Sequence, residues 1–372
     1  MAEITRPPVS SSAGTGSPPG VAAPPLLAVR DLKTYFVQDD GLVKAVDGAS
    51  FDVHARKTLG IVGESGCGKS VTARSILRIV ERPGRIVGGQ ILLQREVGGG
   101  RVAELDLVGL KADGSEMRAI RGGEIALVFQ EPMTSFSPVH TVGNQIVEAL
   151  RLHRELSRAA ARERAIELLR MVGVPRPEGR VDEYAYQLSG GLRQRAMIAV
   201  ALAADPRLLI ADEPTTALDV TTQAQILDLL RALQERNGMA IMLITHDLGV
   251  IAEMADVVVV MYLGRVVEEG PVDDIFHAPK HPYTRALLRS IPNVRSTPRL
   301  KLPTISGSIP HPYNRPSGCP FHSRCPDFMP GLCDAFEPAL VPVGAGQEVA
   351  CFLYPQVRAA SGAPGPVAGA AT

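Results

Sequence analysis

A glycine-rich segment followed by lysine and serine is the clearest place for chemistry in this chain. Residues 63–70 read GESGCGKS and follow an apolar stretch, Thr58–Val62, that is typical of a strand. Glycines let backbone N–H groups curl around an anion, and the N-terminus of a following helix adds its dipole. Lys69 would reach the β- and γ-phosphates of a nucleotide, and the Ser70 hydroxyl would bind Mg²⁺. The predicted contacts of this phosphate-binding loop come from Gly63, Ser65, Gly66, Cys67 (backbone only), Gly68, Lys69, Ser70 and Val71.

A second apolar stretch ends in two carboxylates. Leu208–Ala211 is followed directly by Asp212 and Glu213. Asp212 would hold Mg²⁺ through water, as the acidic residue of the second element of phosphate-binding-loop enzymes does. Glu213 is placed to polarise the attacking water, a role worth about 10²–10⁴ in rate. An apolar strand that ends in Asp-Glu is common by itself, and its position well behind the glycine-rich loop favours the catalytic interpretation.

A third motif, LSGGLRQR at residues 188–195, precedes the apolar stretch Ala196–Ala204. Its serine and glycines at a predicted helix start form a second anion site. One nucleotide does not need two phosphate cradles in one chain, so this cradle would close over a nucleotide held by another subunit. The sequence here resembles the ABC-transporter ATPase family, for which LSGGxxQR is close to diagnostic. The predicted contacts to the partner's nucleotide are Ser189, Gly190, Gly191 and Gln194.

The resemblance covers about residues 26–275 and implies further roles. Gln130 matches a glutamine that touches Mg²⁺ and the attacking water and senses the transmembrane partner. His246 matches a histidine that contacts the γ-phosphate, and residues 216–219, TALD, match a loop that crosses the dimer interface. An aromatic residue upstream of the glycine-rich loop should stack on adenine, and Phe36 is preferred over its neighbour Tyr35. The implied cofactors are ATP and Mg²⁺, the latter bound through Ser70, Gln130 and Asp212.

Short β-branched runs alternate with helical patterns, which predicts an α/β fold with a largely parallel sheet. The resemblance makes this a P-loop ABC ATPase domain, with a RecA-like core plus a helical subdomain at about 131–190, followed by a small C-terminal domain. The predicted strands are Thr58–Val62, Ile125–Phe129, Leu208–Ala211, Ala240–Thr245 and Val257–Tyr262. The predicted helices include Ser70–Val80, Arg158–Val172 and Thr222–Asn237.

Composition divides the chain into four parts. Residues 1–25 and 356–372 are mostly Pro, Gly, Ala and Ser, which predicts disordered tails. The ATPase domain is expected at 26–275 and a C-terminal domain at 276–355. Residues 276–288 and 318–326 are similar to an extension in ATPases of dipeptide, oligopeptide and nickel importers, which narrows the resemblance to that group.

Four of the five cysteines lie near the C-terminus, separated by five, seven and seventeen residues. A reducing cytoplasm disfavours disulfides, and structural zinc usually uses close CxxC-type pairs, which are missing here. Four thiolates on a loop-rich segment suit an iron–sulfur cluster, and some peptide-importer ATPases carry a 4Fe-4S cluster at the matching cysteines. The prediction is a 4Fe-4S cluster, with zinc or simple packing as alternatives, at Cys319, Cys325, Cys333 and Cys351.

Charge and hydropathy bear on the partners. Lys plus Arg and Asp plus Glu number 39 each, so no nucleic-acid partner is indicated. The longest apolar run, Ala196–Ala204, is far shorter than the ~20 residues of a membrane-spanning helix, and the N-terminus lacks a secretion-signal pattern. We therefore expect a peripheral protein at the cytoplasmic face of the cell membrane.

The resemblance implies an ATP-hydrolysing subunit that powers di- or oligopeptide import. Its partners would be a second ABC ATPase, identical or homologous, two transmembrane permease subunits and, indirectly, an extracytoplasmic solute-binding protein. Nickel import by the same group is one alternative. A soluble ABC-type motor is another, although repair members contain a long coiled coil and translation members usually carry two cassettes per chain. A P-loop GTPase or kinase outside the family would have no use for residues 188–195.

Overall fold

The computed structural model describes residues 24–97, 101–131, 135–290, 305, 307–311, 313–344 and 346–364. Within these ranges the strands form two sheets, one of four strands and one of eight. The predicted N-terminal tail, residues 1–25, lies outside the described residues except for its last two. No helix in the described ranges is long and apolar enough to span a bilayer.

The eight-stranded sheet carries the predicted parallel core, in the order β11-β12-β10-β9-β3-β8-β7-β6. Its parallel strands are β6 (Ile125–Val128), β7 (Leu208–Asp212), β8 (Ala240–Ile244), β3 (Thr58–Val62) and β9 (Val257–Tyr262). β3, β7 and β8 are buried along their whole length, as expected for strands covered on both faces. The predicted α/β fold is confirmed, and each predicted strand is found with its ends within one residue.

The same sheet continues into the C-terminal part of the chain. β10 (Arg265–Pro271) pairs antiparallel with β9, and β12 (Glu348–Val349) and β11 (Val341–Pro342) extend the edge. The predicted boundary near residue 276 therefore does not interrupt the sheet.

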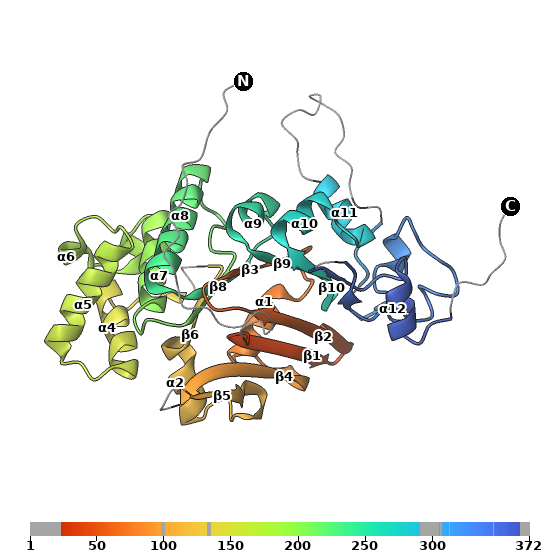
Figure 1. Ribbon diagram of the computed structural model, residues 1–372. Helices are drawn as coiled ribbons and strands as arrows, with labels where there is room; N and C mark the ends of the chain where they lie inside the picture. The colour runs from red at the N-terminus through yellow and green to blue at the C-terminus, as the bar shows by residue number, and fades with distance from the viewer. Residues whose placement is uncertain are drawn as a thin grey trace, which may run out of the picture.

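The second sheet is antiparallel, in the order β2-β1-β4-β5, and the sequence analysis did not predict its strands. Its members are β1 (Leu27–Gln38), β2 (Gly41–Val53), β4 (Gly84–Val97) and β5 (Arg101–Asp106). Helix α1 (Lys69–Ile76) packs against β1, β2 and β7, between the two sheets (Figure 1). The hydroxyls of Thr34 on β1 and Ser75 on α1 share a buried 2.8 Å hydrogen bond. The helix predicted at residues 70–80 extends too far, since α1 ends at Ile76. The left-handed backbone φ of 56° at Arg78 is incompatible with a continuing helix.

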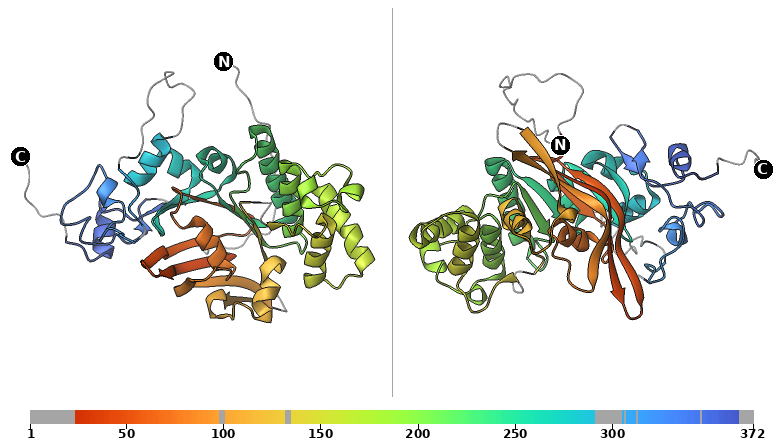
Figure 2. Two further views of the ribbon diagram at one scale, coloured as in Figure 1. Left: turned by 180° about the vertical axis from the view of Figure 1, so that it is seen from behind. Right: turned by 90° about the horizontal axis from the view of Figure 1, so that it is seen from below.

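Helices cover the other faces. α8 (Val220–Asn237), α9 (Leu248–Met254), α10 (Val272–His277) and α11 (Pro282–Arg289) lie on the far side of the large sheet from the antiparallel sheet (Figures 1 and 2). A separate helical layer contains α4 (Val142–His153), α5 (Arg158–Met171), α6 (Pro177–Arg180) and α7 (Gly190–Ala201), with α2 (Ser115–Gly123) beside α4. Short 3₁₀ helices cover Leu107–Gly109, Ala185–Gln187 and His322–Arg324.

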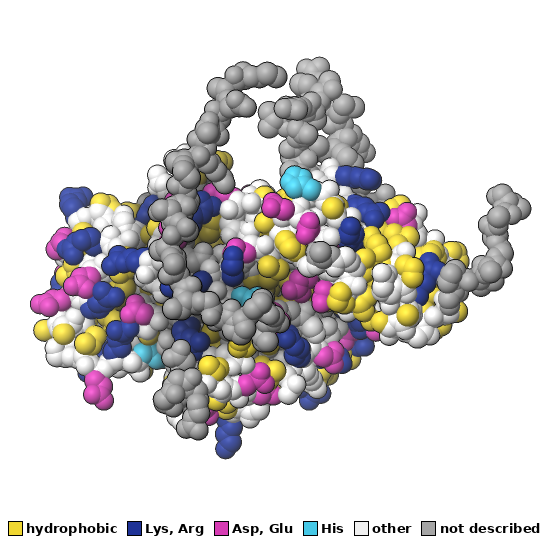
Figure 3. Space-filling view, viewed as in Figure 1, with side chains coloured by type: hydrophobic (Ala, Val, Ile, Leu, Met, Phe, Trp, Pro, Cys, Tyr) yellow, Lys and Arg dark blue, Asp and Glu magenta, His cyan; other side chains and the backbone are white. Residues whose placement is uncertain are grey.

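The helical layer is built from capped, amphipathic helices. The side chains of Thr141 and Ser157 cap α4 and α5, because each accepts a hydrogen bond from the backbone N–H of the third residue of its helix. Leu150 and Leu168 are fully buried between the helices. On the face shown in Figure 3, positive and negative side chains are interspersed over this layer. One ion pair of the layer joins Arg162 and Asp182 at 2.7 Å.

The C-terminal tail prediction is wrong at its start. Residues Pro355–Ala360 form helix α12, which begins with proline in its first turn. Val357 in this helix is fully buried. Proline-rich composition suggested disorder, but proline fits the first turn of a helix, and the buried Val357 side chain packs α12 against the core. Residues 365–372 lie outside the described residues.

Candidate nucleotide-binding site

The glycine-rich loop connects the end of β3 to the start of α1. Gly68, at the N-cap of α1, has a φ of 103°, and a Cβ there would lie 2.3 Å from the carbonyl oxygen of Ala45. At Gly63 a Cβ would lie 2.2 Å from the carbonyl oxygen of Met261. Only glycine fits at these two positions, because neighbouring backbone approaches the loop from both sides. Ser65 and Gly66 are exposed at its rim, and Val71 follows within α1.

Lys69 lies across this loop. Its ammonium group donates to the carbonyl oxygens of Gly63 at 2.7 Å and Glu64 at 3.2 Å, and the residue is 6% exposed. The loop therefore holds a positive charge at its centre, as a phosphate-binding site requires. The Cys67 thiol is buried and its pKa is raised by burial, in agreement with a backbone-only role.

Ser70 and Asp212 meet at the carboxyl ends of two parallel strands. Ser70 Oγ donates to Asp212 Oδ1 at 3.0 Å. Ser70 lies in the first turn of α1, which follows β3 and the glycine-rich loop, and Asp212 is the last residue of β7. Burial raises the pKa of Asp212, the hydrogen bond from Ser70 opposes this, and the charge of Glu213 adds to it. A hydroxyl beside a carboxylate is a donor set that suits Mg²⁺. A cation bound here would favour the ionised carboxylate.

Glu213 is the meeting point of the predicted catalytic side chains. Its Oε2 accepts hydrogen bonds from Gln130 Nε2 at 2.9 Å and Thr216 Oγ1 at 2.9 Å. Its Oε1 lies 3.2 Å from His246 Nδ1. The structure thus brings Gln130, Glu213 and His246 together. The Gln130 side chain is hydrogen bonded to Glu213 and not to the predicted Mg²⁺ ligands Ser70 and Asp212.

The backbone of Glu213 has an unusual conformation that aims the side chain. Its φ is 48°, in the left-handed region that non-glycine residues rarely enter. The Glu213 N–H donates to the carbonyl oxygen of Ile244 on β8 at 2.8 Å, which holds the strand end in place. Strain of this kind typically costs about 1–3 kcal/mol and clusters at functional sites. Thr216, the third partner of Glu213, was predicted only as part of the interface loop, although its place three residues after the carboxylate offered a signal.

The LSGG motif occupies the start of α7. Ser189 is the N-cap residue, with φ −66° and ψ 162°, and its exposed side chain makes no capping hydrogen bond. A Cβ at Gly191 would lie 2.7 Å from Thr222 Cγ2. Helix α7 packs against α4, α5 and β6, whereas α1 packs against β1, β2 and β7. The LSGG motif and the glycine-rich loop are therefore held by different layers of the fold.

Gln194 departs from its predicted role in nucleotide contact. The residue is 2% exposed, and its Nε2 atom has no hydrogen-bond partner among the described residues. Because α7 turns this side chain inward, contact with a nucleotide would require the buried amide to leave the core. The contact predicted for Gln194 does not fit the observed helix orientation.

Phe36 and Tyr35 point to opposite faces of β1. Phe36 shares a face with Thr34 and lies over Gly84, where a Cβ would come within 2.5 Å of its ring. The Tyr35 hydroxyl instead donates a hydrogen bond to Asp47. Burial, and to a smaller extent this hydrogen bond, raises the pKa of Tyr35 to about 12. Neither contact tests which ring stacks on adenine, so the choice of Phe36 stays a prediction.

The four C-terminal cysteines gather in one region. Cys319 N–H donates to the carbonyl oxygen of Cys333 at 2.7 Å, and the Cys351 thiol is influenced by the charges of the other three. Burial raises the pKa of Cys319 and Cys351 to about 12 and that of Cys325 to about 11. Across the described residues, however, no three Cys, His, Asp or Glu side chains are arranged to hold a metal ion. The predicted iron–sulfur cluster has no support from this geometry.

The part of the chain that contains this site is similar to known proteins. Residues 46–216 match the family described as ABC transporter. The probable peptide ABC transporter ATP-binding protein y4tR of Sinorhizobium fredii is 50% identical to this chain over 333 residues, which cover 89% of this chain and 96% of that protein. The chain belongs to the ABC transporter ATP-binding proteins.

Further similarities place this ABC protein in the predicted group. Residues 267–333 match the family described as oligopeptide/dipeptide transporter, C-terminal region. The oligopeptide transport ATP-binding protein AppD of Bacillus subtilis is 48% identical over 330 residues, 88% of this chain and 97% of that protein. The dimeric post-hydrolysis structure of the ATP-binding cassette MJ0796, bound to ADP and Pi, is 26% identical with a TM-score of 0.56, over 66% of this chain and 98% of that chain. This ABC protein is an ATP hydrolase whose reaction is coupled to transport.

Proposed function

We propose that this chain hydrolyses ATP to drive the import of di- or oligopeptides through separate membrane subunits. The observation that carries the hydrolytic role is the convergence of Gln130, Thr216 and His246 on Glu213 beside the Ser70–Asp212 pair. The peptide assignment is supported by the names of the relatives and by the match of residues 267–333 to the peptide-transporter C-terminal region.

The proposed chemistry divides the work among these side chains. Lys69 and the backbone of the glycine-rich loop hold the phosphates, while Ser70 and Asp212 hold Mg²⁺, which neutralises phosphate charge when bound. Glu213 orients and deprotonates the attacking water, and its hydrogen bonds keep the carboxylate aimed at one place. His246, 3.2 Å from Glu213, is placed to meet the γ-phosphate.

The active assembly we propose is a dimer of ATPase subunits. Ser189 and Gly191 of one chain would close over the ATP held by the glycine-rich loop of its partner. The exposed, uncapped Ser189 side chain supports this, because it leaves a hydroxyl and helix N-terminus open to an anion. The similar cassette MJ0796 is dimeric. Tighter binding of ATP by the closed dimer would shift the population toward closure, and hydrolysis would release it.

An apolar hollow beside Gln130 is the proposed docking place for the permease subunits. It has a volume of about 210 Å³ and lies where α2, α4 and α7 meet. Phe129, Phe136 and Met197 are among the side chains that line it. Phe129 precedes Gln130 in the chain, so a permease movement at this hollow would reach Glu213 through Gln130. Two permease subunits would hold this chain at the cytoplasmic face of the membrane, with a solute-binding protein on the other side.

The iron–sulfur cluster stays a proposal for Cys319, Cys325, Cys333 and Cys351. It rests on the presence of four buried or half-buried thiols in the C-terminal region and not on their arrangement. Ligation would need these thiols ionised and rearranged from the positions seen here. Zinc is the alternative metal.

Uptake measurements test the transport assignment. A strain that lacks this chain should lose uptake of labelled di- and oligopeptides, and the intact chain should restore it, whereas a chain with Glu213→Gln should not. Nickel uptake measured in the same strain tests the alternative substrate. Loss of nickel uptake with normal peptide uptake would replace peptide by nickel, and normal uptake of both would favour a soluble ABC-type motor.

A further inference from the structure

An ion pair joins the C-terminal region to the glycine-rich loop. Arg324 donates from Nη1 to Glu64 Oε2 at 2.7 Å and from Nη2 to Glu64 Oε1 at 3.0 Å. This is the two-pronged geometry in which guanidinium and carboxylate groups bind most strongly. The side chain of Arg324 is 4% exposed and that of Glu64 is 21% exposed. The pair is therefore mostly shielded from water, so salt screens it less than a surface pair.

Aromatic side chains hold this pair in position. The hydroxyl of Tyr283, on α11, accepts a 2.9 Å hydrogen bond from the Glu64 N–H, and the hydroxyl of Tyr262 accepts one of 3.2 Å from Arg324. The ring of Phe321 packs on Tyr262 and Tyr283 with centroid separations of 5.2 Å and 5.3 Å. Both the backbone and the side chain of Glu64 are thus fixed from the C-terminal side.

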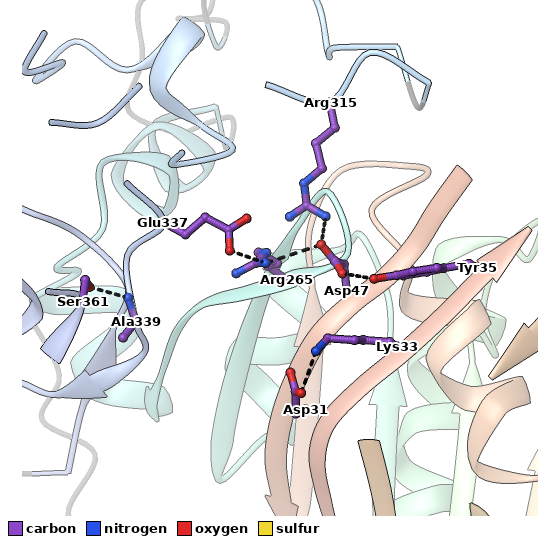
Figure 4. A network of polar contacts seen from close by, with 9 residues as sticks. All are labelled: Asp31, Lys33, Tyr35, Asp47, Arg265, Arg315, Glu337, Ala339 and Ser361. Atoms are coloured by element: carbon purple, nitrogen blue, oxygen red, sulfur yellow. Dashed lines mark hydrogen bonds and ion pairs between the residues drawn. The ribbon is translucent and has the colours of Figure 1, made fainter. Parts of the chain in front are cut away.

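A second set of contacts, which includes Arg315 and Glu337 of the same region, involves Asp47 on β2 and Arg265 on β10 (Figure 4). Arg315 and Arg265 bind the Asp47 carboxylate at 2.6 Å and 3.4 Å, and Arg265 also binds Glu337 at 2.7 Å. The Asp47 N–H donates to the Gly264 carbonyl at 2.8 Å, and the Gly264 N–H donates to the carbonyl of Cys67 at 2.9 Å.

The titration of Asp47 follows from these contacts. Burial would raise the pKa of Asp47, but the hydrogen bond from Tyr35 and the two guanidinium groups outweigh it and lower this pKa. Asp47 therefore stays ionised at neutral pH. The backbone of Asp47 is hydrogen bonded to Gly264, and Gly264 is in turn hydrogen bonded to Cys67 of the loop.

The charge of Glu64 needs a counter-charge at this place. Glu64 lies between Gly63 and the exposed rim of a loop built to bind phosphates, and an unpaired carboxylate there would repel them. We propose that Arg324 is a positioning residue of the ATP site, which acts through Glu64 to hold the loop and to cancel its negative charge. The C-terminal region then sets ATP affinity without touching the nucleotide. This inference rests on the proposed role of residues 63–70 as the ATP site.

The test compares variants of the full chain assembled with its membrane partners. Arg324→Met removes the charge and keeps the length of the side chain, so KM for ATP should rise roughly tenfold while kcat changes little. Adding Glu64→Gln to Arg324→Met should return KM to within about threefold of the parent, because no unpaired charge remains. A residue that only packs would not be rescued by removal of its partner's charge.

A milder variant covers the case in which Arg324→Met does not fold. Arg324→Lys keeps the charge but cannot bind both carboxylate oxygens, so KM should rise about threefold, and Glu64→Gln should remove this rise. If neither Arg324 variant raises KM, or if the rise persists with Glu64→Gln, the proposal is overturned.

Two controls separate this proposal from others. Arg285→Met breaks contacts within the C-terminal region, to Pro279, Lys280 and Asp327, and should leave KM for ATP unchanged. Lys69→Ala should weaken ATP binding by roughly 10²-fold if residues 63–70 form the ATP site. A tight-binding Lys69→Ala chain would count against the site assignment itself, whereas a silent Arg324→Met chain alongside a defective Lys69→Ala chain would count against Arg324 only.

Discussion

The amide nitrogen of Gln130 donates a 2.9 Å hydrogen bond to Oε2 of Glu213, although the two residues are 83 positions apart. Gln130 follows β6 beside the apolar hollow proposed for permease docking, and Glu213 follows β7, the neighbouring strand. The side chain expected to sense the membrane partner is therefore bonded to the side chain expected to activate water. Withdrawal of Gln130 would change the orientation of the carboxylate without any movement of the phosphate-binding loop.

Glu213→Gln should retain ATP binding but lower turnover by about 10²–10⁴, because an amide cannot accept the proton of the attacking water. ATP affinity and phosphate release, measured in the assembled transporter, check this. Thr216→Val is the matched control: it removes one of the hydrogen bonds to Glu213 and should cause a much smaller loss. A Glu213→Gln chain that hydrolyses ATP at the parent rate would show that another group is the base.

Lys69→Ala should weaken nucleotide binding itself, by roughly 10²-fold, since a charge-assisted bond to phosphate contributes about 1.5–3 kcal/mol. Binding of a fluorescent ATP analogue to the full chain measures this. Arg74→Ala, which removes a partly exposed charge from the same helix, serves as the comparison and should have a smaller effect. Equal losses in the two variants would mean that net charge, rather than the loop geometry, determines affinity.

Ser189→Arg should block hydrolysis at the composite site while this chain's own nucleotide binding is preserved. The side chain is exposed and uncapped, so arginine should not disturb α7, but it would fill the cradle meant for the partner's phosphates. Phosphate release by the assembled complex and ATP binding by the isolated chain test the two parts. Glu163→Gln, on exposed α5 surface, changes the net charge by the same +1 and controls for it. Loss of binding in the Ser189→Arg chain alone would contradict the shared-site dimer.

The raised pKa of Glu269 should make the free energy of unfolding decrease as the pH rises. Burial and the nearby charges of Glu348 and Asp52 raise the pKa of Glu269 to about 8, above its ordinary 4.5. The folded chain thus binds a proton that the unfolded chain has released, and stability is lost between pH 4.5 and 8. Glu269→Gln should raise the unfolding midpoint at pH 8 by at least about 2 °C and have less effect at pH 5. Glu235→Gln, on exposed α8 surface, should not; equal shifts at both pH values would point to packing instead.

Protein purified without oxygen should be brown and contain about four irons per chain if the four C-terminal cysteines hold a cubane cluster. Cys325→Ser should bleach it and destabilise the C-terminal region while ATP binding remains, and Cys67→Ser should change neither colour nor iron. Elemental analysis distinguishes the outcomes. Stoichiometric zinc without iron would make this a zinc site, and absence of both would leave the cysteines as packing residues.

The sequence by itself determined the chemistry that depends on neighbouring residues. GESGCGKS at 63–70 needs only its own glycines and the flanking strand to be recognised, because backbone conformation is a local property. The uninterrupted apolar runs at Thr58–Val62 and Val257–Tyr262 gave strands with the observed ends, since strands covered on both faces need apolar residues at every position.

Tertiary structure decided what depends on distant contacts. The antiparallel sheet of β1, β2, β4 and β5 has interrupted register and mixed burial, so its strands carry a weak local signal. The inward turn of Gln194 and the docking of α12 follow from the way helices pack, which a motif does not encode. Arg324 and Glu64 are 260 positions apart, and only the folding of the C-terminal region back onto the large sheet brings the guanidinium to the loop. Local patterns specify which groups are available, and packing between elements specifies which of those groups meet.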